Sequence, residues 1–451
     1  MRNHSLDDRL TASSALLRRI PIASISGTVV NLHGLLVEID GVSGLIAVGD
    51  RLDLCTRDGR IVPAEVIGFR NRLAQAMAFA PLDGLGPGAR AELLTRYHGM
   101  IDVGPGLLGR VIDPLCAPLD RKGALLGGAV ARPTRVAPPD AILRARVGPR
   151  IDLGVRALNC FATCRQGQRL GLFAGSGVGK STLLSMMTRG TACDIVVLAL
   201  VGERGREVRE FLEDDLGPDG LARSVVVVAT SDAPPLMRRQ CAYTAMTIAE
   251  HFRDEGLSVL LLMDSVTRFC LALREIGLST GEPPATRGYP PSVFAELPRL
   301  LERAGPGLQR PDGSAGQITG LFTVLIEGDD HNEPVADAVR GILDGHIVMD
   351  RRIAEAGRYP AIDILRSLSR LAAGCLDEGQ TALIRRARGI LAVHAEMIDM
   401  VRLGAYRAGS DAAVDEALRL TPAIEAVLRQ ERHDITGFDD AFLRLNQAME
   451  A

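Results

Sequence analysis

Tryptophan is absent from this chain and other aromatic residues are scarce, with five tyrosines and eleven phenylalanines among 451 residues. Neither sign of charge dominates: 52 basic and 55 acidic side chains give a formal net charge of −3, which argues against a nucleic-acid binder that depends on bulk positive charge. No apolar run approaches the roughly 20 residues that span a bilayer, and residues 1–20 lack the apolar core of a signal peptide. The eight cysteines include no CxxC pair, so we expect reduced thiols in the cytosol. What remains is the composition of a soluble globular protein with several domains.

The first 95 residues divide into two predicted parts. Residues 1–18 predict a short helix, since Leu6, Leu10 and Leu17 recur at helical spacing among charged residues. This helix is either a frayed end or a docking site for a partner. Residues 19–95 predict a small β-barrel or sandwich, because short β-rich runs alternate with Gly, Asp and Asn turns. We expect strands within 27–30, 34–39, 45–48, 61–69 and 74–79.

Two further domains are predicted along the chain. In residues 96–375, after a leading Pro- and Gly-rich linker, buried strand runs alternate with helical stretches. This pattern predicts an α/β fold, with a mostly parallel sheet covered by helices on both faces. We expect its strands within 169–173, 194–201, 224–229, 259–263, 321–326 and 346–349. Residues 376–451 predict a helical domain, in which Thr421 followed by Pro422 marks the start of a helix.

A phosphate-binding loop is the strongest motif of the sequence. It follows the predicted strand 169–173, precedes an amphipathic helix, and comprises Ala174, Gly175, Ser176, Gly177, Val178, Gly179, Lys180, Ser181 and Thr182. Its glycines leave backbone N–H groups free to wrap phosphate oxygens at a helix N-terminus. In such a loop the lysine reaches the β- and γ-phosphates and the serine hydroxyl ligates Mg²⁺. Ala174 stands where the usual pattern has glycine, at the entry of the loop.

Two acidic residues complete the predicted site. Asp264 ends the apolar run 259–263, a position from which a carboxylate can hold the Mg²⁺ shell through water. Hydrolysis also needs a group that orients or deprotonates water. Glu203 comes just after the strand 194–201 and so lies at the same sheet edge as the phosphate-binding loop. On spacing alone Glu207 and Glu210 are rivals, although both fall inside the following helix.

These segments resemble the catalytic subunits of rotary ATPases. More narrowly, the chain is similar to the type III secretion ATPases, and most similar to their flagellar export branch, from about residue 20 onward. The resemblance is carried by the phosphate-binding loop, by 202–204, 263–268 and 281–291, and by the more family-specific pieces 328–337 and 403–411. It implies ATP and Mg²⁺ as the cofactors.

The resemblance also assigns roles to single residues. It implies that Glu203 is the catalytic glutamate and that Arg204 and Arg268 line the catalytic site and respond to the γ-phosphate. Arg370 matches an arginine finger donated by the neighbouring subunit, which stabilises the charge of the transition state. Tyr359 matches the aromatic residue that stacks on adenine.

The resemblance changes the interpretation of two segments, 426–433 and the acidic stretch from Asp329 to Glu333. The segment 426–433 matches the place of a second adenine-stacking aromatic but contains none. Read alone, Asp329, Asp330, His331 and Glu333 suggest a metal site or, more simply, a solvated turn after a strand. The resemblance implies instead a loop that faces the central channel of a ring.

The function implied by the resemblance is ATP hydrolysis by a homohexameric ring that energises flagellar type III protein export. Such a ring releases export substrates from chaperones and delivers them to an export gate, with proton coupling an analogy from rotary enzymes. The implied partners are a regulatory stator-like protein at the N-terminus, a central stalk protein, membrane proteins of the export gate, export chaperones and their substrates. The chain would be cytoplasmic and would meet the inner membrane only through these partners.

Three alternatives are weighed against this function. An injectisome ATPase would use identical chemistry. The catalytic subunit of a rotary ATP synthase is disfavoured, because 403–411 stands where that subunit carries an acidic lever segment. A ring-shaped RNA translocase is disfavoured, because its barrel should offer stacking aromatics and basic side chains, whereas residues 20–95 contain only Phe69 and Phe79 as aromatics.

Overall fold

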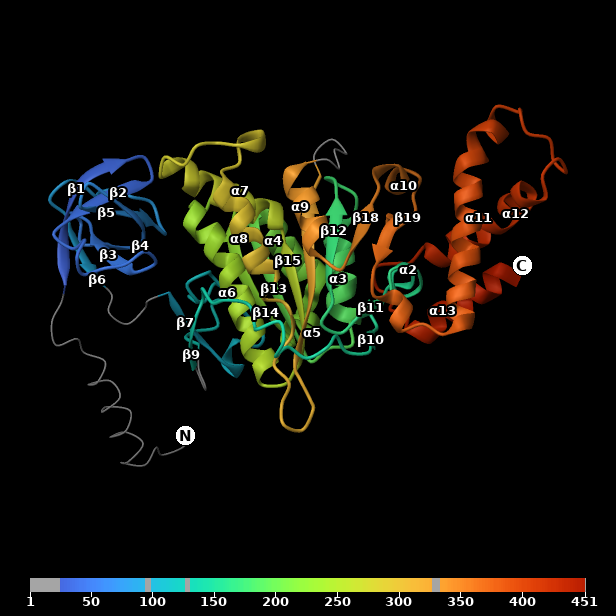
Figure 1. Ribbon diagram of the computed structural model, residues 1–451, viewed down its shortest axis with the longest axis horizontal. Coiled ribbons are helices and arrows are strands. Elements are labelled where there is room, and N and C mark those ends of the chain that lie inside the picture. Colours follow the sequence, from blue (N-terminus) through green and yellow to red (C-terminus); the bar gives the residue numbers. More distant parts are fainter. Residues whose placement is uncertain (1–24, 94–98, 126–129, 327–332, 451) are drawn as a thin grey trace.

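The computed structural model describes residues 25–93, 99–125, 130–326 and 333–450. Figure 1 shows three parts in a row: an N-terminal barrel, a central sheet with its helices, and a group of C-terminal helices. The helix expected within 1–18 lies outside the described residues, and the domain boundaries at 18/19, 95/96 and 375/376 stay predictions. Within the described ranges, no helix has the length and apolar character needed to cross a membrane.

The N-terminal part is a closed barrel rather than a sandwich. Its strands follow one another around the barrel in the order β1-β2-β5-β4-β3-β6; they are β1 (Ser26–His33), β2 (Leu36–Asp40), β3 (Arg51–Cys55), β4 (Ile61–Arg70), β5 (Leu73–Ala78) and β6 (Arg90–Leu93). The strand expected within 45–48 is wrong: this stretch is a turn, in which Leu45 and Val48 are exposed. The sequence missed β3 because charged residues alternate there with Leu52 and Leu54, the two leucines that point into the barrel core.

The central part is a nine-stranded sheet in the order β19-β18-β12-β17-β15-β13-β14-β8, with the short β16 (Gly305–Pro306) paired beside β17. Its strands are β8 (Arg110–Ile112), β12 (Arg169–Ala174), β13 (Ile195–Glu203), β14 (Ser224–Thr230), β15 (Ser258–Asp264), β17 (Gln317–Leu325), β18 (Gly345–Met349) and β19 (Ile362–Ser369). The pairings are parallel except for β19 on β18 and β16 on β17. All six expected strands are present, and the carboxyl ends of the parallel strands meet at one edge. Two small antiparallel pairs lie outside this sheet: β7 (Met100–Val103) with β9 (Val130–Pro133), and β10 (Arg150–Ile151) with β11 (Cys164–Arg165).

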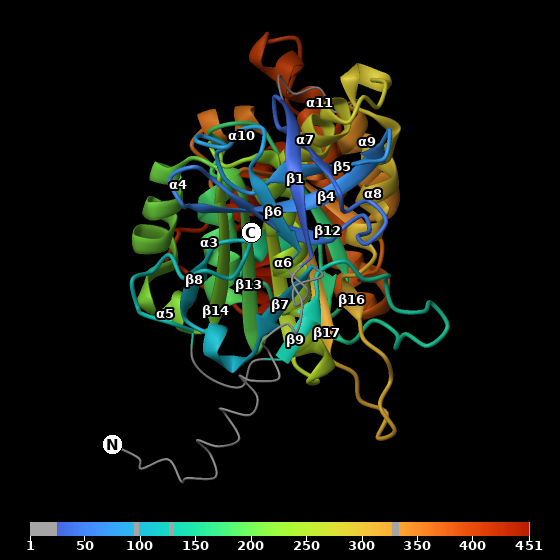
Figure 2. The ribbon, with the colours of Figure 1, turned by 90° about the vertical axis from the view of Figure 1, so that its left-hand side faces the viewer.

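Helices cover both faces of the sheet, as expected (Figure 2). The alternation along β13 shows why: Val197 and Ala199 belong to one buried core, whereas Val196 and Leu198 belong to the other. The first core is covered by α6 (Pro235–Asp254), α7 (Val266–Ser279), α8 (Pro291–Leu301) and α9 (Pro334–Ile342). The second is covered by α2 (Arg156–Phe161), α3 (Lys180–Gly190), the segment from α4 (Gly205–Glu210) to α5 (Gly217–Ala222), and the C-terminal helices.

The C-terminal part consists of α11 (Glu378–Arg402), α12 (Ala412–Leu428) and α13 (Phe438–Glu450). The helix start expected at Thr421 is wrong, since Thr421 and Pro422 lie inside α12. The helix begins after Asp411, whose carboxylate accepts hydrogen bonds from the first free backbone N–H groups. Pro422 is tolerated in the interior because the adjoining Leu420 and Ile424 are fully buried and hold the helix in place.

The barrel is fastened to the central part by a buried ion pair. Nη2 of Arg239 on α6 lies 2.7 Å from Oε2 of Glu65 on β4, and both side chains are almost completely buried. Apolar residues surround this pair from both sides: Leu36, Met77 and Phe79 of the barrel and Leu236 and Ile276 of the helices. The barrel is therefore docked on α6 and α7.

Candidate nucleotide site

The phosphate-binding loop joins β12 to α3 at the carboxyl edge of the sheet. Gly177 and Gly179 have φ angles of 77° and 87°, in the left-handed region that glycine adopts without strain. A Cβ on Gly179 would also lie 3.3 Å from the ring of Tyr359. Because this loop ends in the first turn of α3, its N–H groups and the helix N-terminus point toward one anion-binding space.

A cavity of about 590 Å³ opens at this loop. Most of the predicted site residues line it: Ala174, Gly175, Ser176, Gly177, Gly179, Lys180, Ser181, Thr182, Glu203, Arg204 and Arg268. Val178 does not, because its side chain is buried behind the loop. Asp264 does not line the cavity, but Lys180 donates hydrogen bonds to both Asp264 and Glu203. The expected convergence of the ends of β12, β13 and β15 is therefore present, while the roles of the residues stay predictions.

Lys180 is held by two carboxylates. Its Nζ lies 2.5 Å from Oδ1 of Asp264 and 3.3 Å from Oε1 of Glu203. Burial disfavours the charged ammonium, but the negative charges of Asp264 and Glu203 outweigh burial and raise the pKa of Lys180. Asp264 also accepts a hydrogen bond from the Thr323 hydroxyl at 2.7 Å. The lysine is thus kept protonated and held between the ends of β13 and β15.

Glu203 is the last residue of β13 and is mostly buried. Burial raises the pKa of its carboxyl, and the neighbouring charge of Asp264 raises it further, against the opposing charge of Lys180. A raised pKa brings a carboxylate closer to the basicity that a general base needs. The rivals differ in position: Glu207 lies on α4 and also lines the cavity, whereas Glu210 does not.

Ser181 and Asp264 suit a magnesium ion. Mg²⁺ prefers hydroxyl, carboxylate and water oxygens, and these two side chains supply a hydroxyl from the first turn of α3 and a carboxylate from the end of β15. Across the described ranges, no cluster of three or more His, Cys, Asp or Glu side chains could hold a metal by itself. The sequence also suggested a metal site at Asp329, Asp330, His331 and Glu333. Glu333 caps α9 by accepting a hydrogen bond from the N–H of Ala336, and the other three residues lie outside the described residues.

Three arginines line the cavity: Arg204, Arg268 and Arg351. Arg268 on α7 packs its side-chain carbons where a Cβ on Gly202 would stand, and its buried Nε has no hydrogen-bond partner among the described residues. Arg204 is exposed and pairs with Glu207 at 3.2 Å. The sequence missed Arg351, which also lines the cavity and donates a hydrogen bond to the carbonyl of Ser176 at 3.3 Å. The one feature of the sequence that could have placed Arg351 at the site is its position just after the predicted strand 346–349, because that strand ends at the same edge of the sheet as the loop.

Tyr359 lies beside the loop in a second cavity of about 250 Å³. Tyr359 is 46% exposed, and its backbone carbonyl accepts a hydrogen bond from the N–H of Gln430. The segment 426–433 thus reaches the expected place, but Arg429, Glu431 and Arg432 line the cavity there instead of an aromatic residue. The cavity offers one aromatic face for a base and a charged opposite wall.

Arg370 lies at the other edge of the sheet. It follows β19, which runs back along β18, so that Ser369 pairs with Gly345 at the amino end of β18. The backbone N–H of Arg370 donates to the carbonyl of Asp344, and Asp344 in turn binds Arg169 at the start of β12. The length of β12 alone, about 17 Å at 3.3 Å per residue, separates this point from the loop. Arg370 therefore cannot reach the cavity of its own chain.

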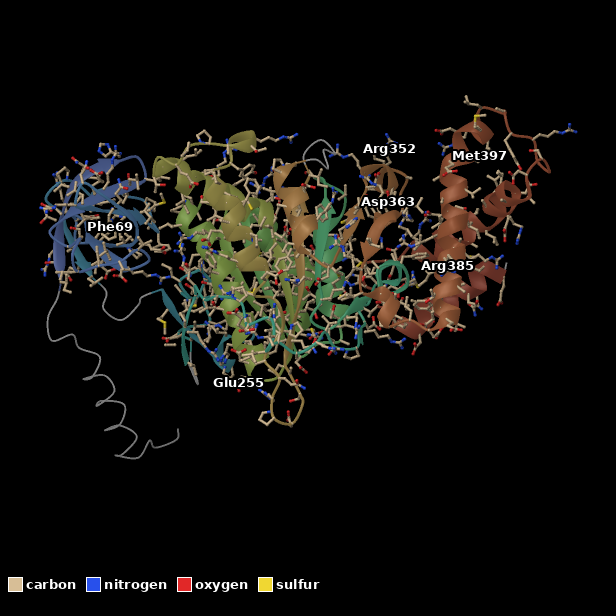
Figure 3. The ribbon with its side chains drawn as sticks, in the orientation of Figure 1. Phe69, Glu255, Arg352, Asp363, Arg385 and Met397 are labelled. Carbon is tan, nitrogen blue, oxygen red and sulfur yellow. The ribbon has the colours of Figure 1, made fainter. Side chains whose placement is uncertain are left out.

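The two edges are easy to locate in Figure 3. Arg352, on α10 (Arg351–Glu355) after β18, marks the edge that carries the cavity. Glu255, just beyond the end of α6, marks the opposite edge. The exposed guanidinium of Arg370 belongs to the second edge, which leaves it available to another molecule.

Comparison with known families agrees with this architecture. A family model described as "ATP synthase alpha/beta family, nucleotide-binding domain" matches residues 154–369. A second, described as "T3SS EscN ATPase C-terminal domain", matches residues 376–447.

Individual proteins match over nearly the whole chain. A flagellum-specific ATP synthase of Caulobacter vibrioides is 52% identical, covering 97% of this chain and 98% of that protein. A type 3 secretion system ATPase of Xanthomonas euvesicatoria is 47% identical, covering 92% of each. Two solved structures of the assembled ATPase EscN from enteropathogenic E. coli, one of them in complex with its central stalk EscO, are 39% identical and cover 94% of this chain and all of theirs, with TM-scores of 0.86 and 0.84.

Proposed function

The chain belongs to the family of flagellum-specific ATP synthases and type III secretion ATPases, and on this premise we propose that it hydrolyses ATP as a homohexameric ring that energises flagellar protein export. The observation that carries the shared-site ring is the separation of Lys180 from Arg370 at opposite edges of one sheet. A chain with this layout completes a catalytic site only by pairing its loop edge with the Arg370 edge of another copy.

Phosphate binding begins with the exchange of partners at Lys180. The ammonium leaves Asp264 and Glu203 for the β- and γ-phosphate oxygens, while the N–H groups of the loop bind the same oxygens. Ser181 and Asp264 would hold Mg²⁺, which would supply charge neutralisation on the phosphates. Arg268, whose Nε lacks a partner in the described structure, and Arg204 respond to the γ-phosphate.

Glu203 orients and deprotonates the attacking water. Its position at the end of β13 sets the carboxylate beside Lys180, where the γ-phosphate binds. Adenine lies against the exposed ring of Tyr359, next to Gly179. Arg370 of the adjoining subunit enters from outside and stabilises the charge of the transition state, an effect worth roughly 10³ to 10⁵ in rate.

The flagellar branch is favoured over the injectisome by the higher identity with the Caulobacter protein. EscN forms an assembly with a central stalk, which supports a stalk partner for this ring. The remaining partners are a stator-like regulator bound to the N-terminal segment, export chaperones with their substrates, and membrane proteins of the export gate. The ring is cytoplasmic and reaches the inner membrane through them, with coupling to the proton gradient as a further step.

A complementation experiment tests both the role in flagellar export and the catalytic site shared between subunits. A strain lacking this gene is supplied with the wild-type chain, Lys180→Ala or Arg370→Ala, and swimming and secreted flagellar subunits are measured. The proposal expects loss of both, and rescue by the wild-type chain alone. Normal motility with loss of injectisome secretion assigns the chain to the other branch, and rescue by Arg370→Ala contradicts the shared site.

A further inference from the structure

An unbroken set of contacts connects the strand of the phosphate-binding loop to Arg370. Phe173, fully buried on β12, is the residue immediately before Ala174. The guanidinium carbon of Arg340, near the end of α9, lies 4.7 Å from the centre of the Phe173 ring. The backbone carbonyl of Arg340 accepts a hydrogen bond from Nη2 of Arg370 at 3.3 Å. One residue on α9 thus touches both the strand that ends in the loop and the arginine at the opposite edge.

The surroundings single out Arg340 among the nearby cations. Arg366 lies on β19, the strand that ends just before Arg370, and pairs with Asp350 at 3.4 Å. His346 meets the Phe173 ring edge-on at 6.0 Å, and burial, with the charges of Arg340 and Arg370, lowers the pKa of this histidine. His346 therefore adds no competing positive charge, and among the contacts described here Arg340 is the cation on the ring.

The ring of Phe173 has little freedom to move independently of its strand. A Cβ on Gly171 would lie 2.5 Å from Cε2 of Phe173, so the aromatic ring occupies the space that the glycine leaves. Packed at the density of a protein interior, such a ring passes a small displacement of the strand to its neighbours instead of absorbing it. The proposed phosphate-binding loop begins one residue away, at Ala174.

We propose that Arg340 is a positioning residue that makes the placement of Arg370, which a subunit lends to its neighbour, depend on the nucleotide state of the lending subunit's own loop. This inference rests on the proposed function, because it requires Arg370 to act in the adjoining site. A cation–π contact changes an equilibrium by a factor of about 2 to 30. Removing it should lower the neighbour's turnover by a similar factor and leave nucleotide affinity unchanged.

We call the contacts from Phe173 through Arg340 to Arg370 the relay. The chain offers matched variants for each part of it. Arg340→Ala removes the guanidinium and keeps the backbone carbonyl. Arg340→Lys keeps a cation over the ring and should restore most of the effect. Phe173→Leu keeps a large apolar side chain but removes the aromatic face. Arg366→Ala removes a neighbouring cation that pairs with Asp350 and whose charge acts on Arg340, so it serves as the control for loss of positive charge beside Arg340.

Mixed rings separate an effect on the neighbour from an effect on the chain's own site. The chain that donates Arg370 to its neighbour is called the lender. The lender carries Glu203→Gln, so that it should bind ATP without hydrolysing it, and it is mixed in rising proportion with wild-type chains. Turnover of the wild-type sites is compared for lenders that also carry Arg340→Ala, Arg340→Lys, Arg366→Ala or Arg370→Ala. Binding of a fluorescent ATP analogue and the mass of the rings confirm that each lender is loaded and assembled.

We expect the Arg370→Ala lender to depress wild-type turnover most strongly and the Arg340→Ala lender to depress it by about 2- to 30-fold. The Arg366→Ala lender should match the Glu203→Gln lender alone, and the Arg340→Lys lender should come close to it. If the Arg340→Ala lender behaves like the Arg366→Ala lender while the Arg370→Ala lender still inhibits, the relay is overturned and the shared site stands. If the Arg370→Ala lender does not inhibit, the shared site itself fails. Where Arg340→Ala chains do not enter rings, the Phe173→Leu lender decides between the same outcomes.

Discussion

The ammonium of Lys180 lies 2.5 Å from the carboxylate of Asp264, so the loop's lysine is already paired before any phosphate arrives. In the proposed mechanism the lysine would bind phosphate and the aspartate would bind the metal, so this ion pair links the two proposed roles. A nucleotide would then replace Asp264 at the lysine and leave the carboxylate available to the metal.

Lysine chemistry gives a direct test of this pairing, because Lys180 and Lys122 are the only two lysines of the chain. Amine acylation requires the neutral amine, and the raised pKa of Lys180 keeps it protonated. At pH 8 an acetylating reagent should modify the exposed Lys122 at least about tenfold faster than Lys180, as read by peptide mass spectrometry. Asp264→Asn should speed the reaction at Lys180 and leave the rate at Lys122 unchanged. Equal rates at Lys180 in both proteins would contradict the pairing.

Replacing the predicted base should separate binding from chemistry. Glu203→Gln keeps the size of the side chain and removes the proton acceptor, so turnover should fall by about 10² to 10⁴ while ATP affinity changes little. Steady-state kinetics and binding of a fluorescent ATP analogue measure the two quantities. Glu207→Gln is the matched control on α4, and a loss as large as that of Glu203→Gln would make Glu207 the base.

The same residue predicts a pH dependence. Glu203 acts as a base only when deprotonated, and burial raises its pKa. Turnover should therefore decline, as the pH falls, at a higher pH than the ordinary glutamate value of about 4.3 would give. A kcat profile between about pH 4 and pH 8, corrected for loss of ring assembly by light scattering, tests this expectation. A decline of kcat centred at or below the ordinary glutamate value is the outcome that this account does not allow.

Base stacking on Tyr359 should appear in the affinity for ATP. Loss of a single stacking ring costs about 1–3 kcal/mol, so Tyr359→Ala should raise KM about 5- to 150-fold with a smaller change in kcat. Tyr359→Phe keeps the ring and should resemble the wild type. If the phenylalanine variant is as impaired as the alanine variant, the hydroxyl and not the ring makes the contact.

The ion pair between barrel and sheet should be costly to break. Burial alone would raise the pKa of Glu65, but the charges of Arg239, Arg135 and Arg51 outweigh burial and lower it. Glu65→Gln leaves the buried Arg51 and Arg239 without their counter-charge, and should lower the free energy of unfolding by about 3–5 kcal/mol at neutral pH. Glu92→Gln, which breaks a more exposed pair with Arg90, should cost less than about 1 kcal/mol. Urea unfolding followed by circular dichroism compares the two.

The sign of the pH effect follows from the lowered pKa. Stability from the Glu65 carboxylate is fully present above the unfolded-state pKa of about 4.3 and is lost as the pH falls through the lower folded-state pKa. The free energy of unfolding of the wild type should therefore fall more steeply than that of Glu65→Gln when both are measured from pH 5 downward. Parallel slopes would show that Glu65 does not titrate with folding.

The parts of the site that the sequence predicted are those with local signals. The loop from Ala174 to Thr182 and the acid Asp264 follow apolar strands buried on both faces, which read as continuous runs. Arg351 was missed because an arginine after a strand has no distinctive spacing, and only the three-dimensional meeting of strand ends places it on the cavity. The role of Arg370 came from family resemblance alone, and its isolation from the loop depends on the pairing of β19 with β18.

The errors in the fold have equally local causes. β19 was not predicted because its buried residues alternate with exposed ones at the edge of the sheet, so it lacks the apolar run that marked the central strands. Conversely, the run 45–48 looked like a strand by composition, but its apolar side chains lie on a surface turn. Thr421 and Pro422 carry a helix-start signal that the packing of α12 overrides.

The placement of Lys180 and Arg370 at opposite edges gives every copy of the chain a head and a tail. Contacts of this heterologous kind have no internal two-fold symmetry, so the subunit number is set by the angle between the two edges and not by pairwise matching. An angle that closes yields a ring, and one that does not yields a helical filament. A ring of this type can also open at a single junction while every other junction keeps its full contact, which turns a closed circle into a lock washer with one incomplete site.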